Sequence, residues 1–118
     1  MIKMSSNGIV VMFKGRLETI PTKRGLNVIT TNIGAEKSES LRGVVNLSAR
    51  IEYITEENYE NLTTMFLTSN NKIDIEDMNR GRYFPNYYIT GESIQLEEKE
   101  DIENNAYYYV GGIQLNKR

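Results

Sequence analysis

The stretch VVNLSARIEYI, which runs from Val44 to Ile54, decides the fold class of this chain of 118 residues. Every second side chain in it is apolar or aromatic, and polar or charged side chains stand between them. A period of two is that of a β-strand with one face buried and the other face in water. The residues on the expected buried face are Val45, Leu47, Ala49, Ile51 and Tyr53.

One helix is expected directly after this strand, at about residues 56–68. Thr55 is a suitable N-cap, and the residues that follow it are acidic, which the positive end of the helix dipole favours. Asn70-Asn71 comes after the segment, and asparagine tolerates the left-handed conformation that ends many helices. The face that recurs at helical spacing consists of Tyr59, Leu62, Thr63, Met65 and Phe66.

Shorter strand patterns lie on both sides of these two elements. Upstream, Ile9–Phe13 is an apolar run, and a weaker pattern covers residues 26–33. Downstream, alternating patterns cover residues 73–77, 87–97 and 107–115. The order is therefore strands, helix, strands.

The last two strands should pair as a hairpin with the acidic tip Glu98–Asn105. The apolar phase slips by one residue near Gly91, which predicts a β-bulge or a sharp bend there. Mostly short connections favour antiparallel pairing. We therefore expect a single, mainly β domain over residues 1–118, folded as an antiparallel β-sandwich or barrel with one flanking α-helix.

Composition excludes several kinds of chemistry. The chain has no cysteine and no histidine, so disulfides, zinc sites built from these residues and nucleophile systems that use histidine are excluded. A net charge of -2 gives no general attraction to nucleic acid or to an anionic membrane. The longest apolar run, Ile9–Phe13, is too short to cross a bilayer, and the N-terminus carries no secretion signal. We expect no cofactor, no small-molecule substrate and an intracellular site of synthesis.

Two acidic clusters are candidate sites. Carboxylates at Asp74, Glu76 and Asp77 are suitable ligands for a hard cation, but a solvated strand face accounts for them and no calcium-loop spacing is present. The second cluster would suit a basic partner or imitate nucleic-acid phosphates, and it would equally serve solubility or assembly as a charged hairpin tip. It comprises Glu97, Glu98, Glu100, Asp101 and Glu103.

A basic segment and the tyrosines complete the candidates. Phosphate contacts from Lys14, Arg16, Lys23 and Arg24 are a weak prediction, because no aromatic residues are interleaved, and Arg24-Gly25 is typical of a loop. Adjacent tyrosines on a strand point to opposite faces, so Tyr108 and one of Tyr87 and Tyr88 should face away from the core. There they would serve protein–protein contact or ordinary cross-strand packing.

From about Leu41 to Leu115, roughly two thirds of its length, the chain resembles small tail-tube-like and tail-tip structural proteins of bacteriophages that infect low-GC Gram-positive bacteria. The matching features are a strand–helix–strand–hairpin order rather than a catalytic signature. They follow the strand from Val45 to Tyr53 and read ITEENYENLTTMF (54–66), IDIED (73–77), YYITGESIQLEE (87–98) and YYYVGGIQL (107–115).

The resemblance implies a non-enzymatic subunit that forms a ring, often a hexamer, with other tail proteins around a channel for DNA. It places the protein in the virion tail after synthesis in the host cytoplasm. Residues 16–40 and the tip Glu98–Asn105 would then reach a neighbouring ring. The expected assembly surface is Tyr87, Tyr88, Tyr108, Glu98, Glu100, Asp101, Lys23 and Arg24.

Two other hypotheses stay open. The first is a small acidic, phage-encoded protein that inhibits a host nucleic-acid-binding or defence protein through the acidic stretch Glu97–Glu103. The second is a carboxylate-dependent hydrolase, which the missing histidine and cysteine and the lack of a cleft motif disfavour.

Overall fold

The computed structural model describes residues 1–23, 43–68 and 72–118. The expected strand at residues 26–33, Arg24 and Asn70-Asn71 lie outside the described residues. The strands are β1 (Ile2–Ser6), β2 (Ile9–Lys23), β3 (Gly43–Thr55), β4 (Ile73–Asp77), β5 (Arg82–Ile89), β6 (Leu96–Asp101) and β7 (Ala106–Lys117), and helix α2 (Glu56–Leu67) lies between β3 and β4.

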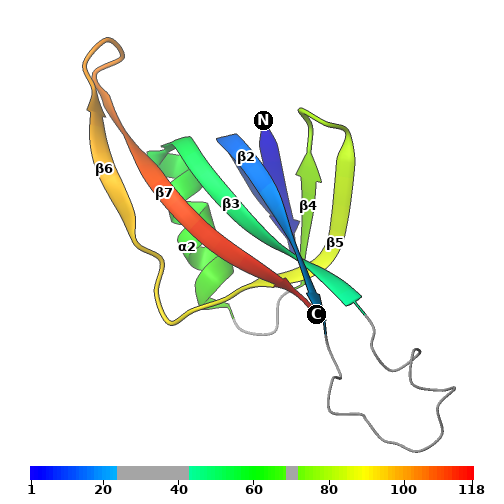
Figure 1. Cartoon of the computed structure of the whole chain (residues 1–118). Coiled ribbons are helices and arrows are strands. Elements are labelled where there is room, and N and C mark those ends of the chain that lie inside the picture. The colour runs from blue at the N-terminus through cyan, green and yellow to red at the C-terminus, as the bar shows by residue number, and fades with distance from the viewer. Residues whose placement is uncertain (24–42, 69–71) are drawn as a thin grey trace, which may run out of the picture.

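The strands form one antiparallel sheet that closes on itself. The neighbours run in the order β3-β2-β1-β4-β5-β7-β6, and a further pairing joins β3 to β7. Six strands therefore make a closed ring of hydrogen-bonded neighbours, and β6 extends outward from β7. Of the two expected architectures, sandwich and barrel, the closed sheet is a barrel. Figure 1 shows α2 packed beside this barrel.

The predicted central strand is confirmed and follows its period of two. Residues of β3 at alternate positions are buried from Leu47 to Ile51, after which the register with β7 shifts and Ile54 is buried instead. Val45 is 38% exposed, because it lies near the end of β3. The rest of the core comes from every barrel strand and from α2: Ile2, Met4, Val11, Phe13, Leu17, Ile73, Ile75, Tyr87, Ile113, Leu115, Leu62 and Met65.

The predicted helix is also confirmed. The Thr55 side chain accepts a hydrogen bond from the Asn58 backbone N–H at 3.3 Å, as an N-cap does. Leu62 and Met65 are buried and anchor α2 on the barrel. The Asn58 side chain ties the first turn to β2 by accepting from the Met12 backbone N–H at 3.1 Å. Capping and one apolar stripe thus fix both the start and the orientation of the helix.

The predicted single strand over residues 87–97 is wrong. The chain forms two strands there, because Gly91 takes a positive φ of 99° that a continuous strand does not allow. β5 pairs with Leu115–Lys117, whereas β6 pairs with the first half of β7, from Ala106 to Gly111. β5 and β6 pair with the same edge of β7, β5 near the C-terminal end of β7 and β6 along its first half. The bend at Gly91 carries the chain from the first of these positions to the second. The bend predicted near Gly91 is confirmed.

The hairpin turn is shorter than predicted. Glu98 to Asp101 belong to β6, and the turn covers only residues 102–105. Two further differences concern the N-terminal part. The pattern did not reveal β1, and β2 continues beyond the predicted Phe13 to Lys23.

Candidate assembly surface

The β6–β7 hairpin continues past the closed barrel. Among the described residues, β6 pairs with β7 alone, so its outer edge carries unpaired backbone groups. Figure 1 shows the hairpin and its turn extending away from the barrel at the upper left. Charged side chains cover this edge, which protects an open strand from indiscriminate pairing.

One face of the hairpin is braced by a tyrosine pair. The ring of Tyr108 stacks on that of Tyr53 from β3, with centroids 4.5 Å apart and planes at 16°. The Tyr53 hydroxyl donates to the Asp101 carboxylate at 3.0 Å. Asp101 also accepts from the Asn104 side-chain amide at 2.8 Å. These bonds from Asn104 and Tyr53 hold the pKa of Asp101 below its ordinary value.

The opposite face is braced against the helix. Tyr109 stacks on Tyr59 of α2, with centroids 4.1 Å apart and planes at 21°. Its hydroxyl donates to the Glu98 carboxylate at 3.4 Å. Loss of hydration, followed by the charge of Glu98, raises the pKa of the Tyr109 hydroxyl. The hairpin is therefore held from both sides, and its direction relative to the barrel is fixed.

The structure corrects the prediction for Tyr87 as an assembly residue. Its side chain is 3% exposed and lies in the core, where its hydroxyl donates to the Val45 carbonyl at 2.5 Å. Burial raises its pKa. The inward phase of β5 places Tyr87 there, and Tyr88 points the other way, half-buried under the Arg118 guanidinium at 5.0 Å. Tyr88 therefore keeps the outward position that the sequence predicted for one of the two.

The other predicted assembly residues lie in separate places. Glu98 and Glu100 are exposed on the hairpin, and Asp101 and Tyr108 are half-buried within its brace. Lys23 is exposed at the far end of β2. The hairpin residues thus come together, and Lys23 does not join them.

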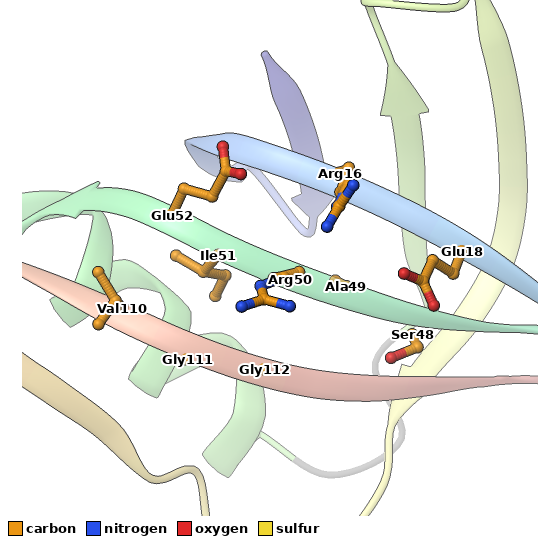
Figure 2. Close-up of a pocket in the computed structure, with 10 residues that line it drawn as sticks. All are labelled: Arg16, Glu18, Ser48, Ala49, Arg50, Ile51, Glu52, Val110, Gly111 and Gly112. Carbon is orange, nitrogen blue, oxygen red and sulfur yellow. The ribbon is translucent and has the colours of Figure 1, made fainter.

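Sequence reasoning did not find an open groove on the outer surface of β2, β3 and β7. Its volume is about 690 Å³. Arg16 of β2 is paired in register with Arg50 of β3, and Arg50 is paired with Gly112 of β7. Figure 2 shows the two arginines in the middle, Glu52 and Glu18 toward opposite ends, and β7 along one side with Val110, Gly111 and Gly112. Only the tertiary pairing of three strands makes this groove.

The arginines of the groove have no carboxylate partner in the described part of the chain. Arg82–Asp77 and Lys99–Glu97 are ion pairs within residues 1–23, 43–68 and 72–118, and neither of them involves Arg16 or Arg50. Two like charges directly opposite each other on neighbouring strands destabilise the pairing. An anion bound between Arg16 and Arg50 would remove that repulsion, so the groove can bind carboxylate or phosphate groups.

Two acidic side chains of β4, Asp74 and Asp77, accept hydrogen bonds from backbone groups and so stabilise the fold. Asp77 is 2% exposed and accepts from the backbone N–H groups of Asn79 at 3.1 Å and Arg80 at 3.3 Å. Asp74 is half-buried and accepts from the Asn86 backbone N–H at 3.0 Å. Asp77 therefore orders the β4–β5 turn, and of Asp74 and Glu76, which strand alternation puts on the expected solvated face, Glu76 is exposed and Asp74 is half-buried.

Within the described ranges, no group of three or more acidic side chains is placed to hold a metal ion. No helix in that part of the chain is long and apolar enough to cross a membrane. No protein family, curated protein or solved structure matches this chain.

Proposed function

We propose that this protein is a non-enzymatic structural subunit that assembles with copies of itself into a ring or tube, as in a phage tail or a related injection machine. The observation that carries the proposal is the β6–β7 hairpin. It extends past the barrel, it contributes little to the buried core, and two tyrosine stacks hold it in a fixed direction. A rigid projection of this kind suits contact with another molecule, because little conformational entropy is lost on binding.

The tip of the hairpin supports a role in protein contact. Ile102 is 82% exposed and Tyr107 is 49% exposed; Ile102 lies between Asp101 and Glu103 in the chain, and Tyr107 is paired with Glu100 across the hairpin. An apolar centre with a polar rim is typical of protein–protein interfaces. The resemblance of the sequence to phage tail proteins supports the choice of a second copy as the partner.

A second candidate function is the capture of a basic host protein by the same acidic hairpin. Exposed carboxylates at Glu98 and Glu100 favour it, because they are displayed on a fixed strand. This function predicts a protein that stays a monomer or dimer at all concentrations.

The oligomeric state distinguishes the two functions. We expect light scattering after size exclusion to show assemblies larger than a dimer as the concentration rises, and negative-stain images to show rings or short tubes. A strict monomer at high concentration, with no ring or tube in images, would contradict the structural role. A control variant, Glu60→Lys, changes one exposed charge on α2 that is not part of the hairpin and should assemble like the native protein.

A further inference from the structure

The hairpin presents two carboxylates on one face. Glu98 is paired in register with Tyr109, and Glu100 with Tyr107, so all four side chains point to the same side. Glu98 and Glu100 are two positions apart on β6, which separates them by about 7 Å. Both are exposed, and neither forms an ion pair within the described part of the chain.

The groove presents two arginines that are neighbours on adjacent strands. Arg16 and Arg50 are exposed and directly opposite each other on β2 and β3, which places their Cβ atoms about 5 Å apart. Gly112, the partner of Arg50 on β7, has no side chain, so a segment of another chain can approach the arginines from that side. The arginine pair of the groove and the carboxylate pair of the hairpin are therefore complementary in charge.

The hairpin cannot fold back onto the groove of its own chain. Gly111 and Gly112 continue directly into the hairpin, and the stacks on Tyr53 and Tyr59 hold it in its outward direction. Nucleic acid suits the groove less well, because Glu18 and Glu52 at its ends would repel a continuous row of phosphates. Two carboxylates carry less negative charge than a continuous row of phosphates, so the two acids repel them less.

We propose that Glu98 and Glu100 of one copy bind Arg16 and Arg50 in the groove of a second copy. The inference rests on the proposed function and names the two surfaces that join. Because the hairpin and the groove are different surfaces of one molecule, the contact is heterologous. Such a contact repeats from copy to copy and gives a ring or an open filament.

Charge reversal on each surface tests the contact. The hairpin variant Glu98→Lys/Glu100→Lys and the groove variant Arg16→Glu/Arg50→Glu each place like charges together when assembled alone. Like charges at an interface oppose association, so each variant alone should need a concentration at least about tenfold higher to assemble. In an equimolar mixture both contacts are again between opposite charges, and assembly should return. The readout is sedimentation and light scattering, with Glu60→Lys/Glu92→Lys as the matched control.

The outcomes separate this inference from the proposed function. If the native protein stays monomeric, both fail. If the native protein assembles and the two variants assemble equally well, or if their mixture does not recover, the inference is overturned and the structural role stands. Binding of a DNA oligonucleotide that is lost in Arg16→Glu/Arg50→Glu, with self-assembly unchanged, would also overturn it. Recovery in the mixture shows that both variants are folded.

Discussion

Replacing Gly15 by alanine should destabilise the protein far more than the same change at Gly112. The two glycines flank Arg50 of β3 from opposite sides, on β2 and on β7. The register of β2 on β3 shifts between Lys14 and Gly15, and the bulge brings the two backbones close together. A Cβ atom at Gly15 would overlap the Arg50 carbonyl oxygen and lie 3.1 Å from its carbonyl carbon.

The size of the stability loss in Gly15→Ala follows from the atoms that must move to make room for the added Cβ. Carbon atoms stop repelling one another at about 3.5 Å, and the overlapped atoms at Gly15 belong to backbone that the β3–β7 pairing holds in place. Overpacking that forces backbone shifts costs about 3 kcal/mol in unfavourable cases. At Gly112 the nearest atom to an added Cβ is the Ala49 carbonyl oxygen at 3.6 Å, an ordinary contact. There alanine should be neutral or should stabilise by about 0.5 kcal/mol, because it restricts the unfolded chain.

Urea unfolding followed by far-UV circular dichroism measures the difference. At a protein concentration below that of self-association, Gly15→Ala should lower the midpoint and leave the slope unchanged. The corresponding loss in melting temperature is about 3–5 °C for each kcal/mol at this chain length. Equal midpoints for the two variants would refute the reasoning, since the close approach at the bulge would then not constrain the residue.

Three more predictions concern the core and the hairpin brace. Tyr87→Phe removes a buried hydrogen bond and should cost about 1 kcal/mol in urea unfolding, with no change in the far-UV spectrum. Leu62→Ala should cost about 2–5 kcal/mol, because it leaves a cavity between α2 and the barrel, whereas Leu67→Ala, at a side chain 72% exposed, should cost less than about 0.5 kcal/mol. Tyr53→Phe should raise the pKa of Asp101 toward its ordinary 3.8, measured by NMR titration of the carboxyl carbon. Because the folded pKa is lowered, the stability that this carboxylate contributes is present above pH 3.8 and is lost as the pH falls through the folded value. An unchanged pKa in the Tyr53 variant would contradict the role of that hydrogen bond.

Local patterns in the sequence were enough to predict the long central strand and the helix. In β3 the alternation is uninterrupted from Leu47 to Ile51, and burial on one face of a sheet imposes that period wherever the partners come from. In α2 the cap at Thr55 and the apolar stripe act within a few residues of each other, so no distant contact is needed to find them. The break at Gly91 was visible for the same reason.

The exchange of partners along β7 was not predictable in this way. Whether residues 87–97 form one strand or two depends on which strand edges are available to pair with them along the barrel. One edge of β7 pairs with β6 along its first half and with β5 near its C-terminal end. The inward position of Tyr87 has the same cause, because the strands that pair with β5 determine which of its side chains point into the core. An alternating pattern indicates that a strand has two different faces, but it does not show which face points into the core.

Composition, capping and periodicity are local properties, and they are enough to predict a mainly β chain with one capped helix and no cysteine or histidine chemistry. Closure of the sheet through β3 and β7, the brace on both faces of the hairpin and the pairing of Arg16 with Arg50 in a groove become visible only in the folded chain. These features join residues far apart in the chain, and their geometry depends on strand register and twist. Register is set by the packing of the whole barrel, which no short segment contains.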